Sequence, residues 1–254
     1  MTDALIGYSG FVGGSILRAR SFDALFRSTN IAEIRGARFD TVVCCGAPAE
    51  KWRANRHPDE DLQRLAMLTD ALTDVVARRF VLVSTIDVYP VPNGVDENTP
   101  IDPAAGEPYG RHRFALEEFC RSHFDTTIVR LPGLYGHGLK KNALFDLLHD
   151  RPVDTIPGNA RFQFYDTDRV WQDVERILSA GLAVANITAE PIDMATIARH
   201  AFDRELPLAF SATAASYDVR SRYDGLVQGR DGYWFSAEAV LHGIRQFVER
   251  ERSP

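Results

Sequence analysis

The most constraining feature of the sequence is a glycine-rich segment that follows a short apolar run near the first residue. It reads Gly7-Tyr8-Ser9-Gly10-Phe11-Val12-Gly13, with a glycine at every third position. Residues 4–6 predict a strand and the residues up to Arg20 predict a helix. A tight turn between them lets the backbone approach a pyrophosphate, which the helix N–H groups and dipole then bind. We therefore predict a dinucleotide-binding βα unit, the alternative being a glycine-rich turn without a ligand.

Short apolar runs alternate with helical patterns along the rest of the chain, which is typical of an α/β protein. Further strands are expected at 24–27, 41–45, 80–84, 126–131, 162–165 and 184–188, and further helices at 59–78, 109–123, 142–149, 167–180 and 236–249. About ten residues separate Asn30 from the strand at Thr41. The third strand usual in a dinucleotide-binding sheet, with its loop, is therefore expected to be shortened or absent.

These patterns predict a Rossmann-type, doubly wound parallel sheet with a smaller C-terminal substrate-binding lobe. We expect the dinucleotide-binding domain to span residues 1–133, with 181–200 returning to it. The smaller lobe is then expected to consist of residues 134–180 and 201–254.

Composition narrows the classes of partner. A formal net charge of −6 argues against general binding to nucleic acid or anionic membranes, since both require a basic surface. No apolar run approaches the roughly 18–20 residues of a membrane span. Neither the cysteines, among them the adjacent Cys44 and Cys45, nor the histidines have the spacing of a disulfide framework or a metal site. Residues 1–3 lack the features of a signal peptide, so we expect a cytoplasmic protein.

The end of the second strand bears on the choice of dinucleotide. A carboxylate there would bind the ribose hydroxyls of NAD, whereas an arginine accommodates the 2′-phosphate of NADP. The sequence has Arg27 and Ser28 at this edge, and Asp23 comes too early. These residues favour NADP(H) over NAD(H), unless Arg27 is only a solvated surface charge. Cys45, Gly46 and Ala47 follow the next strand and are expected to border the cofactor.

Two later segments carry a resemblance to a known family. They read Phe80-Val81-Leu82-Val83-Ser84-Thr85-Ile86-Asp87-Val88-Tyr89 and Pro108-Tyr109-Gly110-Arg111-His112-Arg113. Together with the glycine spacing they resemble the extended short-chain dehydrogenase/reductases, the NAD(P)-dependent epimerase/dehydratase-like family, over roughly residues 4–175. The resemblance implies that Tyr109 is the catalytic tyrosine and that Thr85, with Ser84 as the fallback, supplies the catalytic hydroxyl.

The chemistry requires such a group, because a carbonyl that accepts hydride must also receive a proton, and a tyrosine can give one if its pKa of about 10 comes down. The family has a lysine four residues after the tyrosine, where this sequence has Arg113. At about 5 Å and an effective dielectric near 20, one positive charge contributes roughly 3 kcal/mol, or about 2 pKa units. Arg113 thus retains the positive charge of the family's lysine, but an arginine cannot pass a proton on as a lysine can.

The loop after Thr85 bears on the reaction. In the family's sugar-nucleotide 4,6-dehydratases this loop typically reads Thr-Asp-Glu before Val-Tyr, whereas here Ile86 replaces the acid that protonates the leaving hydroxyl and Asp87 follows. The resemblance therefore argues against dehydration and leaves ketone reduction, alcohol oxidation or epimerisation. Asp87 becomes a candidate substrate-binding residue, and the preceding Lys51 and Trp52 are candidates for shaping the same site.

The second half of the chain supplies the candidate substrate contacts. The resemblance puts Pro132 beside the nicotinamide and makes Arg161 the candidate for binding the diphosphate of a nucleotide sugar. Lys140, Lys141 and Asn142 stand at an expected helix start, where a phosphate would be bound. Each of these polar residues has the alternative of being solvated surface. Asp168 is expected to cap the helix that follows it.

The sequence thus predicts an NAD(P)-dependent oxidoreductase or epimerase that acts on a nucleotide-activated keto-sugar or a similar carbonyl compound. The alternative from another class is a non-catalytic NAD(P)-binding sensor or scaffold, which the change at Arg113 keeps open. A third alternative is an unrelated nucleotide-binding module, in which the spacing of Thr85, Tyr109 and Arg113 would be a coincidence. A homodimer formed through helices 59–78 and 109–123 is expected from the family.

Overall fold

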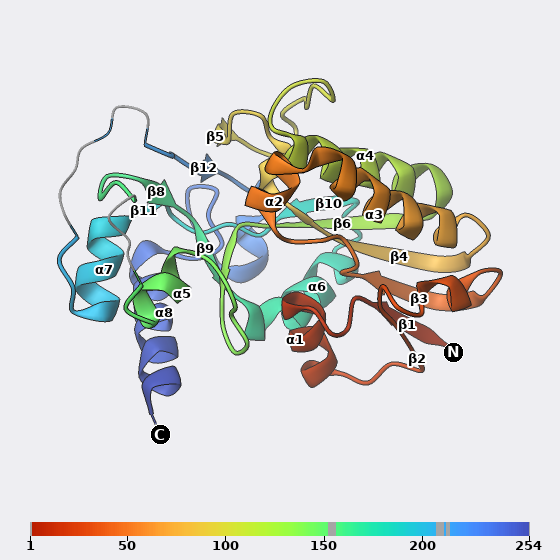
Figure 1. Ribbon diagram of the computed structural model, residues 1–254, viewed down its shortest axis with the longest axis horizontal. Helices are drawn as coiled ribbons and strands as arrows, with labels where there is room; N and C mark the ends of the chain where they lie inside the picture. Colours follow the sequence, from red (N-terminus) through yellow and green to blue (C-terminus); the bar gives the residue numbers. More distant parts are fainter. Residues whose placement is uncertain (1, 152–155, 207–210, 212–213, 254) are drawn as a thin grey trace. The chain divides into compact units, whose positions relative to one another are not determined.

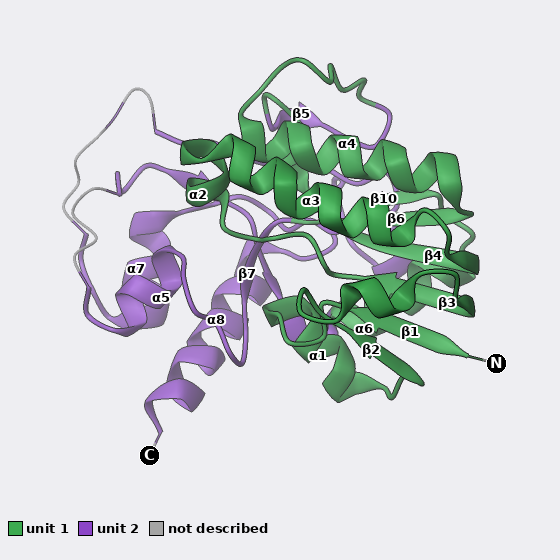
Figure 2. Cartoon of the chain, turned by 45° about the vertical axis from the view of Figure 1, so that its right-hand side comes forward, with its two compact units in different colours: residues 1–91, 99–131, 170–185 green, residues 92–98, 132–169, 186–254 purple. Residues whose placement is uncertain are grey.

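The computed structural model describes residues 2–151, 156–206, 211 and 214–253 (Figure 1). The chain divides into two compact units (Figure 2). Unit 1 consists of Met1–Val91, Thr99–Leu131 and Val170–Ala185, and unit 2 of Pro92–Asn98, Pro132–Arg169 and Asn186–Pro254. The sequence assigns residues 170–180 to the smaller lobe and 181–200 to the dinucleotide-binding domain, whereas the structure has residues 170–185 in unit 1 and residues 186–200 in unit 2. In unit 1, α6 (Val170–Ser179) packs against α1 (Phe11–Ala19).

Unit 1 is built on a six-stranded sheet with the strand order β10-β6-β4-β3-β1-β2. The strands are β1 (Asp3–Ile6), β2 (Ala24–Phe26), β3 (Arg38–Cys44), β4 (Val76–Thr85), β6 (Thr126–Leu131) and β10 (Val184–Asn186). The pairs β1–β2, β1–β3, β3–β4 and β4–β6 are all parallel. The strand order and direction confirm the predicted Rossmann-type sheet.

The expected loss of a strand beyond β2 is also confirmed. After β2 the chain passes through the short 3-10 helix η1 (Ile31–Ile34) and enters β3, which pairs with the other side of β1. The six-stranded sheet therefore ends at β2. The strand order reverses beside β1, and open parallel sheets bind their ligands at such a point, outside the carboxyl ends of the strands.

Helices cover both faces of this sheet. Figure 2 shows α1 and α6 on one face and α3 (Pro58–Leu72) with α4 (Pro108–His123) on the other, next to the short α2 (Lys51–Arg56). Strand residues such as Val42, Leu82 and Ile128 pack with Leu72 and Leu116 of these helices in one buried cluster. Burial of this apolar surface is the main term that holds the layers together.

The predicted helix at 59–78 is too long. The helix α3 ends at Leu72, and Val76 already pairs with Arg38 as the first residue of β4. Val75 and Val76 continue the apolar pattern of the helix, but pairing with β3 determines their conformation. This is a case in which tertiary contacts override a local pattern.

Unit 2 consists of three two-stranded sheets and several helices. The strands pair as β7 (Gly133–Tyr135) with β9 (Phe164–Asp166), β8 (Arg161–Phe162) with β11 (Ile192–Asp193), and β5 (Asn93–Val95) with β12 (Asp218–Val219). The longer helices are α5 (Ala143–Leu148), α7 (Met194–Phe202) and α8 (Ala237–Arg252), and the 3-10 helices are η3 (Thr167–Arg169) and η4 (Asp224–Val227). The expected strand at 162–165 is divided in two at Gln163, whose side chain donates to Ala189 O and Val219 O.

Two properties of the described residues bear on partners. No helix within them has both the length and the apolar character of a membrane span. They also contain no group of three or more His, Cys, Asp or Glu side chains that could hold a metal ion.

Candidate active site

The glycine turn after β1 has no room for side chains. Gly7 has a φ of +83°, and a Cβ atom there would lie 2.4 Å from the carbonyl oxygen of Cys45. A Cβ at Gly13 would lie 2.1 Å from the carbonyl oxygen of Gly7. The N–H of Gly10 donates to that same oxygen over 2.9 Å, which closes the turn. Glycine is therefore required at 7 and 13, so that the first turn of α1 packs directly on the backbone leaving β1.

The start of α1 fits an anionic ligand. Its N-cap residue is Gly10, no side chain caps it, and its first turn holds no acidic residue. Ser9 and Gly10 are exposed, and Phe11 and Val12 are half-buried. The first N–H groups of a helix have no intrahelical partner and carry the positive end of its dipole. A helix start with these properties, at the carboxyl end of β1, has the donors that a pyrophosphate requires.

The loop after β3 borders this turn. The N–H of Cys45 donates to Ile6 O over 2.8 Å, so the loop leaves the sheet beside Gly7. A Cβ at Gly46 would lie 2.9 Å from the Ile6 Cγ2 atom. Cys45 and Gly46 thus lie beside the glycine turn, and Ala47 follows them and packs against the core of unit 1.

Arg27 and Ser28 are exposed just beyond β2. The Arg27 guanidinium carbon lies 6.0 Å from the centre of the Tyr8 ring, and its Nε donates to Thr29 Oγ1 over 3.0 Å. Asn30 Oδ1 accepts from the Arg27 N–H over 2.7 Å and holds this turn in place. The structure therefore brings Arg27 next to the glycine segment.

Thr85 and Tyr109 meet at the end of β4. Tyr109 is buried in the first turn of α4, and the Thr85 side chain lies near enough to act on its hydroxyl and lower its pKa slightly. The N–H of Tyr109 donates to Asn55 Oδ1 of α2 over 2.9 Å. A Cβ at Gly110 would lie 2.0 Å from the carbonyl oxygen of Asp87, in the 3-10 helix η2 (Ile86–Val88). The glycine after the tyrosine is what allows α4 to start so close to the Thr85 loop.

Arg113 lies one turn further along α4. Its guanidinium carbon is 4.2 Å from the centre of the Tyr109 ring. Only 3% of the residue is exposed, and its terminal nitrogens donate to the Asp61 carboxylate and to Pro48 O. The Arg113 Nε atom is buried and has no hydrogen-bond partner among the described residues. The positive charge that the sequence predicts beside the tyrosine is therefore present, together with a counter-ion that it does not predict.

Asp87 and Lys51 form a second ion pair at the same place. Lys51 Nζ donates to Asp87 Oδ1 over 2.7 Å, and the Asp87 N–H donates to Thr85 Oγ1 over 3.1 Å. The two charges act on Tyr109 in opposite directions, since Asp87 raises and Lys51 lowers its pKa. The half-buried pair thus links the Thr85 loop to the start of α2.

Burial dominates the proton affinity of Tyr109. Desolvation raises its pKa, and the opposing effects of Arg113, Lys51 and the Thr85 side chain do not cancel this, so the net direction is upward from 10. The charge of Arg113, which is all that the sequence indicates, would by itself lower the pKa instead. In the protein without cofactor, the phenol is therefore the stable form at neutral pH.

Ser84, the fallback for the catalytic hydroxyl, belongs to a different network. Its Oγ donates to Glu117 Oε1 over 2.6 Å. Glu117 is fully buried and pairs with Arg130, whose Nη1 in turn donates to the Tyr89 hydroxyl over 2.8 Å. Ser84 thus belongs to the packing between β4, β6 and α4, and Thr85 supplies the hydroxyl near Tyr109.

The remaining candidates belong to unit 2. Pro132 is buried, and Lys140, Lys141 and Arg161 are at least partly exposed. Asn142 caps α5, because its Oδ1 accepts from Phe145 N over 3.0 Å while its Nδ2 donates to Leu134 O over 2.7 Å. Asp168 lies in η3, directly ahead of α6.

Sequence reasoning misses Asn55, Asp61, His112 and Glu117. Asp61 and Glu117 stand among other charged residues on their helices, where a carboxylate ordinarily indicates a solvated face. A usable signal existed only for Asp61, because a buried arginine beside the tyrosine requires a carboxylate partner.

Three comparisons with known proteins bear on this site. The family model described as "NAD dependent epimerase/dehydratase family" matches residues 13–149. Among curated proteins, no sequence matches.

Solved structures of similar fold include MoeE5 in complex with UDP-glucuronic acid and NAD, with 18% identity, a TM-score of 0.74 and 99% of each chain covered. UDP-glucose 4-epimerase from Thermotoga maritima with UDP-glucose has 16% identity, a TM-score of 0.72 and 99% of each chain covered. A dTDP-4-dehydrorhamnose reductase from Bacillus anthracis in complex with NADP has 15% identity and a TM-score of 0.72, with 98% of this chain and 99% of that one covered. At these identities the likeness is one of fold.

Proposed function

The chain belongs to the NAD dependent epimerase/dehydratase family, and we propose on that premise that it is an NAD(P)-dependent oxidoreductase or epimerase. Its substrate in this proposal is a nucleotide-activated keto-sugar or a similar carbonyl compound. The observation that carries the proposal is the buried Tyr109, with Arg113 over its ring and Thr85 acting on its hydroxyl.

The position of this group in the sheet supports a redox role. Cys44 pairs with Ile6 on one side and with Leu82 on the other, in parallel strands. The glycine turn after β1 and the Thr85 loop after β4 therefore leave the sheet at the same edge. A dinucleotide bound at the glycine turn runs along that edge. When bound, the nicotinamide group would give or take a hydride at the substrate carbon.

The protein's part is to move the proton. In this proposal the Tyr109 hydroxyl donates its proton to the substrate oxygen, and the Thr85 hydroxyl binds the same oxygen and orients it. Burial raises the pKa of Tyr109, so the phenol carries its proton at neutral pH, while the positive charges of Arg113 and Lys51 favour release of that proton. This state suits ketone reduction, and the apolar Ile86 in the following loop suits a reaction without dehydration.

The test is Tyr109→Phe, assayed with NADPH and NADH across a panel of keto-sugar nucleotides. Loss of the proton donor is expected to lower kcat by about 100- to 10,000-fold, because positioned proton transfer contributes on that order. The dissociation constant of the cofactor, measured by fluorescence titration, should stay within about twofold of wild type. Unchanged turnover would remove Tyr109 from the reaction.

NADP(H) is the proposed cofactor, with NAD(H) as the alternative. Arg27 is exposed beside Tyr8 of the glycine segment, and Ser28 adds a hydroxyl at the same turn. A charge-assisted hydrogen bond contributes roughly 1.5–3 kcal/mol, so Arg27→Ala should weaken NADPH by about 10- to 100-fold and NADH little. Arg35→Ala is the matched control, since Arg35 is a surface arginine paired with Asp70. Equal losses for NADPH and NADH would remove the preference.

We also propose a substrate-binding role for each of the residues Asp87, Lys140, Lys141, Asn142 and Arg161, taken one by one. Arg161 is the strongest of them, since it is exposed and its guanidinium suits a diphosphate. Asn142 is the weakest, because both ends of its amide are engaged in capping α5. A homodimer is proposed through α3, on which Leu62 and Met67 are exposed.

A non-catalytic sensor or scaffold remains the second candidate. It is favoured by the complete engagement of the Arg113 terminal nitrogens with Asp61 and Pro48. The two functions separate in one experiment. A protein that binds NADPH tightly and turns over no member of the panel is a sensor, whereas turnover that depends on Tyr109 identifies an enzyme.

A further inference from the structure

A buried cluster of charged side chains connects α3 to α4 beside Tyr109. Asp61 of α3 is 5% exposed, and Arg113 of α4 is 3% exposed. Arg113 Nη2 donates to Asp61 Oδ1 over 2.9 Å, and Arg113 Nη1 donates to the other carboxylate oxygen. His112 Nδ1 lies 2.8 Å from Asp61 Oδ2. One carboxylate therefore binds two neighbouring side chains of α4.

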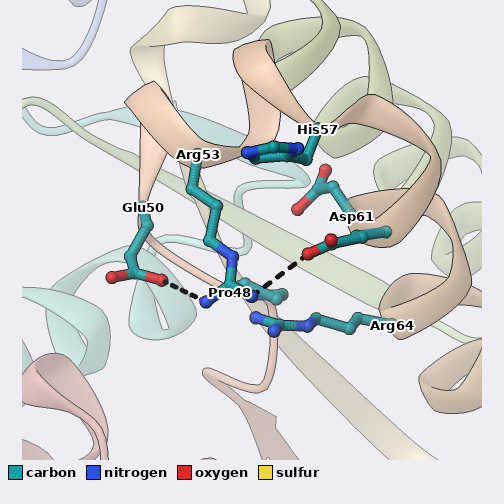
Figure 3. Close-up of a pocket in the computed structure, with 7 residues that line it drawn as sticks. Pro48, Glu50, Arg53, His57, Asp61 and Arg64 are labelled. Carbon is teal, nitrogen blue, oxygen red and sulfur yellow. Dashed lines mark hydrogen bonds and ion pairs between the residues drawn. The ribbon is translucent and has the colours of Figure 1, made fainter.

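The same carboxylate belongs to a pocket in unit 1. Figure 3 shows Asp61 in it together with Pro48, Glu50, Arg53, His57 and Arg64, and Glu60 completes the lining. Arg53 is paired with Glu50 over 3.7 Å and with Glu60 over 3.1 Å. The charges of Arg53, Glu50 and Glu60 compensate one another. The Asp61 carboxylate instead is bonded to the side chains of His112 and Arg113.

The hydrogen bonds of Arg113 determine where its guanidinium lies. The guanidinium is planar with its N–H groups directed outward in a fixed fork, so bonds to both Asp61 and Pro48 O restrict its orientation. The guanidinium carbon is thereby held 4.2 Å from the centre of the Tyr109 ring. An arginine loses about 2 kcal/mol of rotamer entropy when fixed, and a buried arginine without a counter-ion is strongly unfavourable. Without Asp61 the guanidinium would lose its counter-ion and would be held only by Pro48 O and the Tyr109 ring.

We propose that Asp61 is a positioning residue that acts through Arg113 and holds the guanidinium against the Tyr109 ring. The proposal rests on the proposed role of Tyr109 in proton transfer. The charges that act directly on the pKa of Tyr109 are those of Arg113, Asp87 and Lys51. Asp61 therefore influences the tyrosine by fixing the position of Arg113, and needs no contact with substrate or cofactor.

A double-mutant cycle tests the proposal in the full-length protein. Its members are Asp61→Asn, Arg113→Met and the double variant. Misplacement by about 1 Å costs roughly 100-fold in rate, so each single change should lower kcat by about 10- to 100-fold with little change in KM. The double variant should equal Arg113→Met within about twofold, because a residue that acts only through Arg113 has no effect once Arg113 is absent.

The matched control is another buried carboxylate–arginine pair of unit 1. Glu117 is fully buried and Arg130 is 3% exposed, and their Oε2–Nη2 distance is 2.6 Å. Glu117→Gln should lower the unfolding temperature as Asp61→Asn does, while leaving kcat within about twofold. If Arg113→Met does not fold, the double variant, which has neither charge, still provides the comparison with Asp61→Asn.

A spectroscopic arm is independent of turnover. With tyrosine labelled at ¹³Cζ, the Tyr109 signal is assigned by its loss in Tyr109→Phe. It should move in Asp61→Asn and Arg113→Met alike, and stay in place in Glu117→Gln. Two results would overturn the proposal: losses in kcat that multiply in the double variant, or a Tyr109 signal that Asp61→Asn leaves unmoved. If the wild type turns over no substrate, the proposed function fails and the signal alone decides the positioning role.

Discussion

Replacing Gly110 by alanine tests whether activity depends on how closely α4 approaches the loop after β4. A Cβ at Gly110 would lie 2.0 Å from the carbonyl oxygen of Asp87, whereas real Cβ contacts essentially never fall below 3.0 Å. The obstacle is backbone and cannot rotate away, so α4 or η2 must move by about 1 Å. Tyr109 and Thr85 stand on opposite sides of this contact, and the displacement therefore changes the distance between their hydroxyls.

The size of the effect follows from that displacement. Overpacking a well-packed interior costs about 1–3 kcal/mol. In a protein of this size each kcal/mol lowers the unfolding temperature by roughly 2–4 °C, so a fall of about 2–12 °C is expected. A misplacement of about 1 Å between catalytic groups costs roughly 100-fold in kcat. The dissociation constant of the cofactor should stay within about twofold, because the glycine turn follows a different strand.

The assay combines thermal unfolding, fluorescence titration with NADPH, and kcat on the best substrate of the panel. Gly225→Ala is the control, since Gly225 lies in η4 with an ordinary φ and a Cβ added there would meet no atom of the described residues within 4 Å. It should change neither unfolding temperature nor kcat. A Gly110→Ala protein that loses stability but retains wild-type kcat would refute the dependence of turnover on the Tyr109–Thr85 contact.

Two further predictions concern neighbouring groups. Thr85→Ala should lower kcat by about 10-fold or more. Ser84→Ala breaks only the bond to Glu117, so it should cost about 1–3 kcal/mol of unfolding free energy and leave kcat unchanged. The reverse pattern would make Ser84 the catalytic hydroxyl. Burial raises the pKa of Asp61, but the hydrogen bonds from Arg113 and His112 outweigh burial, and the net pKa of Asp61 is lowered. The ionised carboxylate therefore stabilises the fold above about pH 4, and this stabilisation is lost as the pH falls below that value. The difference in unfolding free energy between wild type and Asp61→Asn, measured in urea from pH 7 to pH 3, should therefore narrow on acidification, and a constant difference would contradict the assignment.

The sequence predicts what depends on local pattern. Residues 126–131 form a strand with the predicted bounds, since β-branched and apolar side chains favour a strand and Ile128, Val129 and Leu131 are buried. The glycine spacing predicts the turn after β1 because a Cβ at Gly7 or Gly13 has no room there. The short interval after Asn30 predicts the missing outer strand, since a helix and a strand require more residues than it contains.

Other features depend on contacts between distant segments, and the pattern gives no information about them. The end of α3 is determined by the pairing of Val76 with Arg38. The assignment of α6 to unit 1 depends on its packing against α1 and on Trp171, whose ring centroid lies 6.1 Å from that of Phe22 in the segment after α1. The direction of the Tyr109 pKa shift depends on burial, which a count of nearby charges omits.

Arg113 stands where the resemblance leads us to expect a lysine, and its surroundings argue against simple decay of the site. A site released from selection on its chemistry has no need to bury an arginine, because a buried charge is costly unless it is paired. Here the guanidinium is paired with Asp61, bonded to Pro48 O and held over the Tyr109 ring, on three separate segments of unit 1. Arginine at 113 therefore places a positive charge beside the tyrosine, and a carboxylate partner on α3 determines the position of that charge.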